Sequence, residues 1–106
     1  MILFPPCKIN LGLHILDKRE DGYHNPDSLM FQVPFTDMLE IIAAPEFSFS
    51  SSGLEISYAV ASGGPVDEKF NLCVQAYQLM KSEYNIPDVK IHLHKIIPMG
   101  GGLGGG

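Results

Sequence analysis

The sequence predicts an α+β domain in which one helix packs on one face of a mixed β-sheet, and three observations support this fold class. Residues 7–15 alternate apolar and polar side chains, which is typical of a half-buried strand. Residues 70–84 change to a period near 3.6, which is typical of an amphipathic helix. Residues 89–94 alternate again, so the order of elements favours a layer of one sheet covered by a helix.

Composition limits the class of protein. The chain has 106 residues, of which 45% are hydrophobic and 18% charged, as in a single small globular domain. Its net charge of −5 disfavours binding to nucleic acid or to an acidic membrane surface. The apolar run at the start is too short for a signal peptide, so we expect a cytoplasmic protein. Cys7 and Cys73 are expected to be small buried thiols, and the alternative is a disulfide between them.

The strand at residues 7–15 carries Lys8 and Asn10 on its polar face. Pro34 is expected to mark the edge or the end of a later strand. Ser51, Ser52 and Gly53 are expected to form the turn of a hairpin. The further strands expected before the helix are residues 28–35, 37–44, 46–50 and 54–60.

Two other segments have clear local signals. Residues 17–27 are rich in charge and contain Asp-Gly and Asn-Pro, so we expect a loop. The helix is expected to begin near Asp67, which would be its N-cap, and to turn an apolar stripe from Phe70 to Tyr84 toward the core.

The end of the chain is a run in which six of the last seven residues are glycine. A dinucleotide fingerprint would need an acidic residue about 20 positions later, and the P-loop pattern fails because Gly106 occupies the place of its lysine. Glycines still allow the backbone to turn with positive φ and to approach phosphate oxygens closely. From the residues alone, a phosphate-binding loop and a flexible tail both remain open.

Three motifs then occur in a fixed order: KINL at residues 8–11, DGYH at 21–24 and PMGGGLGGG at 98–106. Together they resemble the N-terminal part of the GHMP kinase superfamily, and the resemblance covers nearly the whole chain. DGYH followed by SLMFQV resembles the branch that acts on a cytidine diphosphate substrate. This implies that ATP, with Mg²⁺, phosphorylates the 2-hydroxyl of the methylerythritol part of that substrate in the non-mevalonate isoprenoid pathway.

The resemblance also implies roles for individual residues. Lys8 matches the active-site lysine of the family and Asn10 a substrate-pocket asparagine, while Tyr23 and His24 match the pair that holds the cytosine ring. Asn71 and Lys95 match positions near the adenosine of ATP. The residues that match the loop around the ATP phosphates are Pro98, Gly100, Gly101, Gly102, Gly104, Gly105 and Gly106.

Each of these residues also has an ordinary structural interpretation. Lys8 could be a solvated strand lysine, and Tyr23 and His24 could simply pack a loop against the sheet. His92 and His94 share one strand face and could chelate a metal, but no third ligand has suitable spacing, so a solvated face is favoured.

The family pattern implies that this chain is a partial N-terminal ATP-binding domain, cut at the glycine loop. In the family the loop continues into Ser-Ser and a helix, and the catalytic Asp and a second domain come later. Residues 1–106 alone are therefore expected to be inactive. The alternatives are another GHMP kinase, such as homoserine or mevalonate kinase, or a non-catalytic nucleotide-binding module. The oligomeric state is not predicted.

Overall fold

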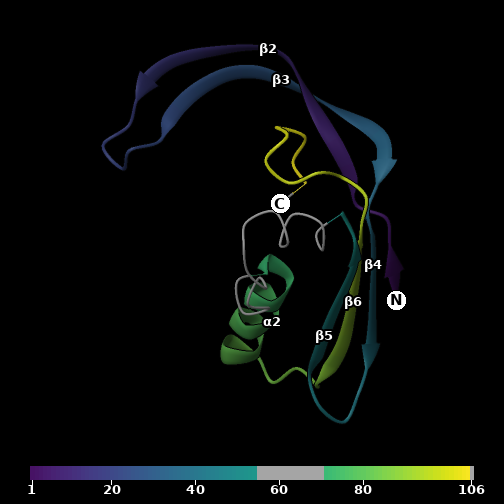
Figure 1. The fold of residues 1–106 in the computed structure, drawn as a ribbon. Coiled ribbons are helices and arrows are strands. Elements are labelled where there is room, and N and C mark those ends of the chain that lie inside the picture. Colours follow the sequence, from purple (N-terminus) through teal and green to yellow (C-terminus); the bar gives the residue numbers. More distant parts are fainter. Residues whose placement is uncertain (55–70, 106) are drawn as a thin grey trace, which may run out of the picture.

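A computed structural model describes residues 1–54 and 71–105, which form a four-stranded sheet, a separate two-stranded arm and one helix (Figure 1). The α+β class is confirmed, but the described strands belong to two sheets and not to one. In spatial order, the sheet contains β1 (Ile2–Leu3), β4 (Met38–Ala43), β6 (Val89–Lys95) and β5 (Ser48–Gly53). The arm contains β2 (Pro6–Lys18) and β3 (His24–Thr36), and the helix is α2 (Leu72–Glu83).

The four-stranded sheet is mixed, as predicted. β4 pairs with β6 in antiparallel register, with Ile41 opposite Ile91, and β5 pairs with the other edge of β6 in parallel. Because β5 and β6 are parallel, the chain crosses over between them, and α2 lies in that crossover. The strands expected at residues 37–44 and 89–94 are both confirmed.

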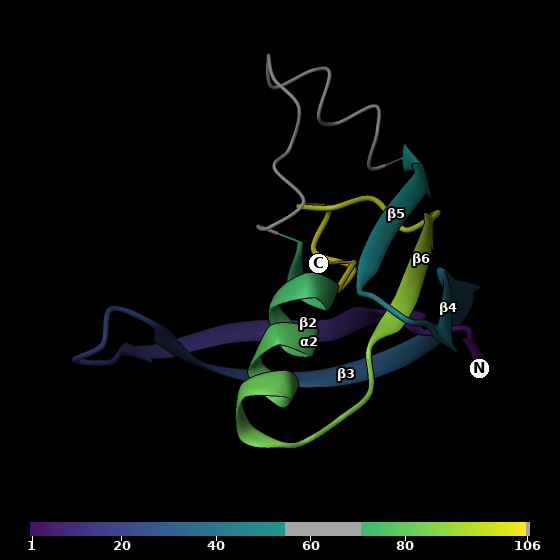
Figure 2. The same cartoon turned by 90° about the horizontal axis from the view of Figure 1, so that it is seen from below.

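Helix α2 packs on one face of this sheet, as Figures 1 and 2 both show. The rings of Phe47 and Tyr77 stack with centroids 4.2 Å apart, and Val74 is fully buried. Apolar side chains of β4, β6 and α2 line a cavity of about 330 Å³ between helix and sheet. The predicted stripe therefore faces the sheet in its middle, while Tyr84 at its end is exposed.

The helix begins later than expected. Its N-cap is Asn71, whose side chain accepts a hydrogen bond from the backbone N–H of Cys73, so Asp67 is not the cap of this helix. Asp67 and Phe70 lie outside the described residues. Cys7 is buried, Cys73 is half-buried, and no disulfide joins them. In the described part of the chain, no helix is long and apolar enough to cross a membrane.

The hairpin expected around residues 51–53 is wrong. Ser51, Ser52 and Gly53 are the last residues of β5, and they pair with Leu93, His94 and Lys95. Serine and glycine usually indicate a turn, but here the long-range pairing with β6 outweighs that local preference. The second strand of the predicted hairpin falls almost wholly outside the described residues.

The loop expected at residues 17–27 is too long. β2 runs on to Lys18 and β3 starts at His24, so only residues 19–23 connect the strands. Register shifts on both sides of residue 14 bend the arm, and Gly12 takes a positive φ of 74° in one of them. The strand expected at 28–35 is confirmed as part of β3, and Pro34 lies near its end.

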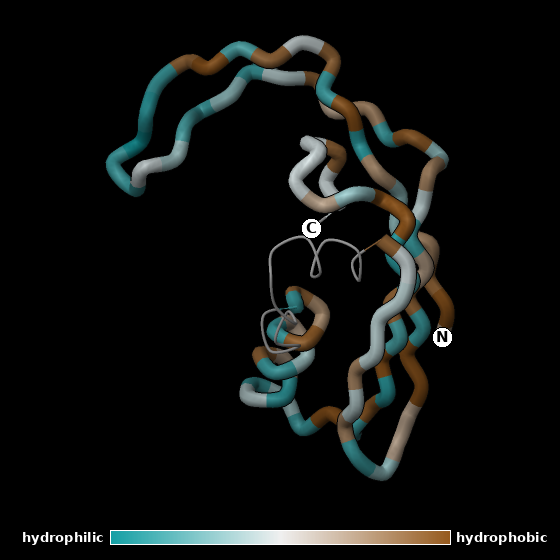
Figure 3. Tube along the Cα trace, viewed as in Figure 1, coloured by the Kyte–Doolittle hydropathy of each residue, from teal (hydrophilic) through white to brown (hydrophobic). Residues whose placement is uncertain are grey.

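Hydrophobic and hydrophilic residues alternate along the arm, and its tip is hydrophilic (Figure 3). Within the described residues, β2 and β3 pair only with each other, and only Cys7 at the base of the arm is fully buried. The expectation of a half-buried strand is therefore wrong beyond that base. The exposed apolar side chains of β2 are Ile9, Leu11, Leu13, Ile15 and Leu16.

Gly53 lies where β5 ends against β6, and we predict that Gly53→Ala is strongly destabilising. Its φ is 87°, and a Cβ there would collide with the carbonyl oxygen of Lys95. We expect the free energy of unfolding, measured in urea by circular dichroism, to fall by about 2 kcal/mol or more.

Gly22→Ala is the matched control for this variant. Gly22 has the same φ of 87° but open space around the position of a Cβ. It should lose only the strain of a left-handed residue, about 1 kcal/mol. Equal losses for the two variants would contradict the predicted collision with Lys95.

Candidate functional site

Lys8 and Asn10 lie on the same side of β2, as the alternation predicted, and are hydrogen-bonded to each other. Lys8 Nζ donates to Asn10 Oδ1 at 2.6 Å, and Asn10 Nδ2 donates to Ser28 Oγ at 2.8 Å. The Ser28 hydroxyl donates in turn to the carbonyl oxygen of Gly12 at 2.7 Å. This relay orients the Asn10 amide, because only its oxygen can accept from an ammonium group.

Lys8 forms no ion pair with a carboxylate of the described residues. Across residues 1–54 and 71–105, ion pairs form at Arg19, Lys81 and Lys95 but not at Lys8. Its recorded partner is the neutral amide of Asn10. An ammonium group held in this way keeps its full charge available to an anion.

The glycine loop leaves β6 and folds back onto β2 (Figure 1). The Lys8 backbone N–H donates to the carbonyl oxygen of Leu103 at 2.9 Å, and a Cβ at Gly104 would lie 3.2 Å from Lys8 Cγ. Gly100, Gly102 and Gly104 have φ between 72° and 74°, while the residues between them do not have positive φ. Successive N–H groups in such alternating conformations form concave surfaces that bind anions.

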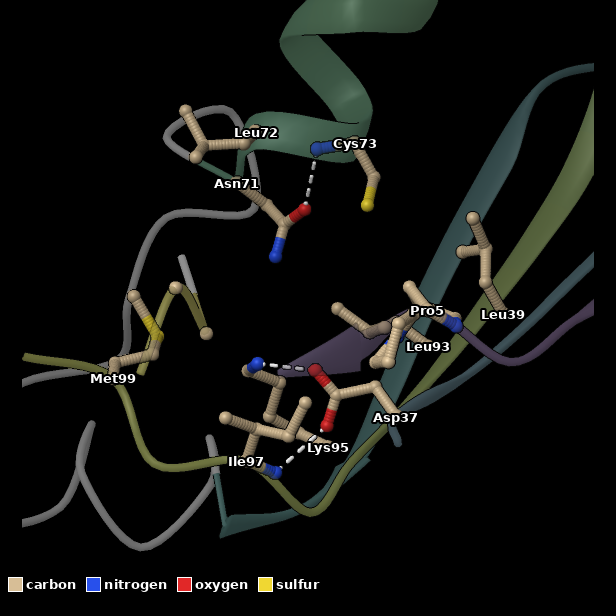
Figure 4. Close-up of a pocket in the computed structure, with 13 residues that line it drawn as sticks. Pro5, Asp37, Leu39, Asn71, Leu72, Cys73, Leu93, Lys95, Ile97 and Met99 are labelled. Carbon is tan, nitrogen blue, oxygen red and sulfur yellow. Dashed lines mark hydrogen bonds and ion pairs between the residues drawn. The ribbon is translucent and has the colours of Figure 1, made fainter. Parts of the chain in front are cut away.

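A cavity of about 310 Å³ lies between the glycine loop, the sheet and the start of α2 (Figure 4). Most of its wall is apolar, and Leu93, Ile97 and Met99 contribute to it. The amide nitrogen of Asn71 points into it from the start of α2. The polar or loop residues that line it are Asp37, Asn71, Lys95, Gly104 and Gly105.

Asp37 and Lys95 form a buried ion pair at the wall of this cavity (Figure 4). Lys95 Nζ donates to Asp37 Oδ2 at 2.5 Å, and both residues are about 5–6% exposed. Asp37 Oδ1 accepts from the backbone N–H groups of Ile96 at 2.6 Å and Ile97 at 2.8 Å. The carboxylate therefore holds both the lysine and the first residues of the glycine loop.

The pKa of the Asp37 carboxyl is lower than its ordinary value. Burial raises this pKa, because a charge is poorly solvated in the interior. The hydrogen bonds from Lys95, Ile97 and Ile96 act in the other direction and together outweigh burial. The group is therefore a carboxylate at neutral pH.

The structure brings most of the predicted site residues into two adjoining groups. Lys8 and Asn10 lie beside the loop, while Asn71 and Lys95 line the cavity, and Gly104 lines the cavity and lies beside the Lys8 side chain. Pro98 is exposed at the start of the loop, and its carbonyl oxygen lies on the side of Gly105 where a Cβ would be. Asn71 has a local role as well, because it caps α2. Gly106 lies outside the described residues.

Tyr23 and His24 are not brought to either group. Tyr23 is 73% exposed in the turn of the arm, and His24 opens β3 opposite Lys18. Lys18 is ten residues along β2 from Lys8, on the order of 30 Å of extended chain. The arm arches over the side of the molecule that carries the glycine loop and α2 (Figure 1).

Sequence reasoning missed Asp37 and Ser28. Asp37 appeared only as the first residue of an expected strand, although it lies between β3 and β4 and contacts residues 58–60 positions away. The only available signal was an acidic residue directly before a buried apolar strand, which is an unusual place for a charge.

His92 and His94 are half-buried, and serine hydroxyls of β5 lie within hydrogen-bond distance of their ring nitrogens. Ser50 Oγ is 2.8 Å from His92 Nδ1, and Ser52 Oγ is 3.2 Å from His92 Nε2 and 2.8 Å from His94 Nδ1. Among residues 1–54 and 71–105, no group of three His, Cys, Asp or Glu side chains could hold a metal ion.

We predict that the Asp37–Lys95 pair contributes to stability in a pH-dependent way. Because the folded pKa of Asp37 lies below its ordinary value of 3.8, this contribution is present above about pH 4. It is lost as the pH falls through the folded pKa. Urea unfolding between pH 7 and pH 2 should show this loss in the wild type and not in Asp37→Asn/Lys95→Met, which leaves no buried charge unpaired. If the free energy of unfolding changed with pH in the same way for the wild type and the double variant, the contribution of the pair would be ruled out.

Comparison with known proteins agrees with this geometry. The family model described as "GHMP kinases N terminal domain" matches residues 71–106. The "4-diphosphocytidyl-2-C-methyl-D-erythritol kinase" of Cytophaga hutchinsonii is 52% identical over the whole of this chain, and that of Azobacteroides pseudotrichonymphae is 44% identical. The chain spans 36% and 37% of their lengths.

A solved structure supports the same relationship. The "Crystal structure of 4-(cytidine 5'-diphospho)-2C-methyl-D-erythritol kinase" superposes with a TM-score of 0.70 at 31% identity. The match covers 99% of this chain and 35% of that one. Residues 71–106 therefore match the GHMP kinase N-terminal family model, and the relatives that resemble the whole of this chain, over about a third of their own length, are named as 4-diphosphocytidyl-2-C-methyl-D-erythritol kinases.

Proposed function

We propose that this chain is part of an ATP-dependent kinase of the cytoplasm. It would phosphorylate the 2-hydroxyl of 4-diphosphocytidyl-2-C-methyl-D-erythritol on the route to isoprenoid precursors. The names of the relatives support this substrate. The single observation that carries the proposal is the hydrogen bond between the backbones of Lys8 and Leu103, because it sets the turns of the glycine loop beside a lysine that has no carboxylate partner among residues 1–54 and 71–105.

In this proposal the phosphates of ATP bind between the glycine loop and Lys8. Phosphoryl transfer depends on positioning and on stabilising the negative charge that is shared among the phosphate oxygens. The N–H groups around Gly100, Gly102 and Gly104 would donate to those oxygens. Lys8 would add a full positive charge at the same place, oriented by Asn10.

The nucleoside of ATP would occupy the cavity behind the loop. Its wall is mostly apolar, which suits a base, and the charge of Lys95 is already neutralised by Asp37. Asn71 and Lys95 would offer hydrogen bonds there without attracting phosphate. The contrast between a neutralised Lys95 and an uncompensated Lys8 therefore favours one direction of the nucleotide, with its phosphates toward β2.

The acceptor substrate would lie along the inner side of the arm, with its reactive hydroxyl near Lys8 and Asn10. Tyr23 and His24 at the tip would hold the cytosine, by stacking and by hydrogen bonding. The arching of the arm over the glycine loop supports this arrangement (Figure 1).

Two parts of the reaction are not assigned to described residues. Among residues 1–54 and 71–105, no group of three His, Cys, Asp or Glu side chains could hold Mg²⁺, so its ligands are not assigned. The catalytic Asp is expected outside the residues described here. Since the chain spans about a third of its relatives' length, we expect residues 1–106 alone to give no turnover. We would therefore test activity in a chimaera in which residues 1–106 replace the matching segment of the Cytophaga hutchinsonii kinase.

Gly105→Ala should weaken ATP binding by the chimaera on the order of tenfold or more, because the loop must change shape. A Cβ at Gly105 would lie 2.7 Å from Ile97 Cγ2 and 2.8 Å from the Pro98 carbonyl oxygen. Gly101→Ala is the matched control, since its nearest contact would be an ordinary 3.7 Å. Titration calorimetry with ATP checks both, and equal affinities would contradict the role of this loop.

Tyr23→Ala and His24→Ala should each weaken binding of the cytidine diphosphate substrate on the order of tenfold or more, and ATP binding little. Calorimetry of both ligands with the chimaera separates the effects. Tyr84→Ala and His14→Ala, at other exposed sites, are the controls. Unchanged affinity for the cytidine ligand would remove this substrate and favour another GHMP kinase reaction, such as that of homoserine or mevalonate kinase.

A further inference from the structure

We propose that Asp37 is a positioning residue of the nucleotide site: its carboxylate fixes the ammonium group of Lys95 and the first turn of the glycine loop, and so sets the affinity for the nucleoside end of ATP. This inference rests on the proposed function. It assigns a role to a buried residue that no sequence motif indicated.

The contacts of Asp37 divide cleanly between its two oxygens. Oδ2 binds the Lys95 ammonium at 2.5 Å, while Oδ1 binds two consecutive backbone N–H groups, of Ile96 and Ile97, at 2.6 and 2.8 Å. Rotation of the carboxylate would break all three hydrogen bonds. The direction in which the chain leaves β6 and the place of the Lys95 head group are therefore set together.

The backbone of Asp37 is fixed as well. Its N–H donates to the carbonyl oxygen of Pro5 at 3.0 Å, in the segment where the chain passes from β1 to β2. Asp37 itself lies where the chain returns from β3 to β4. The carboxylate is thus attached to the junction of the two sheets, which is a rigid place from which to hold a binding group.

Stability alone does not explain a buried ion pair at this place. Replacing such a pair by apolar side chains of similar volume is often neutral or stabilising, since two charges must lose their water. The pair does supply hydrogen-bond donors at the cavity wall without net charge. Lys95 has three N–H donors, and Asp37 accepts from its ammonium group. Donors without net charge suit a base or a ribose hydroxyl better than a phosphate.

The test compares three variants of the chimaera by the KM for ATP, the kcat and the KM for the second substrate. Asp37→Asn keeps an oxygen for Ile96 and Ile97 but presents an amide to the ammonium of Lys95. It should raise the KM for ATP on the order of tenfold and change the other two constants less than about threefold. Lys95→Met should have a similar effect.

The double variant Asp37→Asn/Lys95→Met decides whether Asp37 acts through Lys95. If it does, adding Asp37→Asn to Lys95→Met changes the KM for ATP less than about threefold. A further tenfold rise would overturn the proposal. This comparison does not use Asp37→Asn alone, and in Lys95→Met the Asp37 carboxylate keeps its hydrogen bonds from the N–H groups of Ile96 and Ile97.

A second readout does not depend on the nucleotide. Nuclear magnetic resonance of ¹⁵N-lysine should give a protected ammonium signal for Lys95 that Asp37→Asn abolishes, and an unchanged signal would overturn the proposal. Asp88→Asn is the matched control, since Asp88 binds Lys81 and Tyr77 directly before β6, at the opposite end of that strand from Lys95, and its replacement should leave the KM for ATP unchanged. A wild-type chimaera without ATP binding would contradict the proposed function, and the ammonium signal would then decide the positioning role alone.

Discussion

The arrangement of this domain depends on the hydrogen bonds that the Asp37 carboxylate accepts from Lys95, Ile96 and Ile97. Two connections between the sheet and the arm meet at this residue, since its N–H binds Pro5 and its neighbours belong to β3 and β4. The same side chain holds the exit of β6 through Ile96 and Ile97. Loss of the carboxylate would leave Lys95 charged and unpaired in the interior, which costs about 3–5 kcal/mol in comparable cases. One side chain therefore couples the sheet, the arm and the glycine loop.

The two lysines of the site differ because of what surrounds them. Lys95 is buried and neutralised, whereas Lys8 is oriented by an amide and keeps its charge. The glycine loop runs between them, and Gly104 lies beside the Lys8 side chain while lining the cavity of Lys95. A ligand with one charged end and one largely apolar end would fit this gradient in a single direction. The difference in charge between the two ends of the site thus comes from the neighbours of the two lysines and not from the lysines alone.

Local patterns predicted much of the fold. The alternation at residues 37–44 and 89–94 and the helical period after residue 70 all correspond to elements, because side-chain spacing reflects which face is buried. The turn predicted at residues 51–53 was wrong because these residues form a strand only by pairing with β6, some 40 positions away. The exposure of the arm could not be predicted either, since alternation indicates an apolar face but not whether another element covers that face.

In the candidate site too, local patterns indicated some features, whereas others depend on contacts between distant segments. Lys8, Asn10 and the glycine loop could be found from motifs, but the contacts that shape the loop join distant segments. Asp37 holds its first residues across about 60 positions, and Lys8 holds Leu103 across the sheet-to-arm junction. A glycine-rich segment has little conformational preference of its own, so it takes one shape only where such contacts fix it. Because the loop is anchored at both ends, its N–H groups are arranged before a phosphate arrives, and binding need not supply the free energy of ordering them.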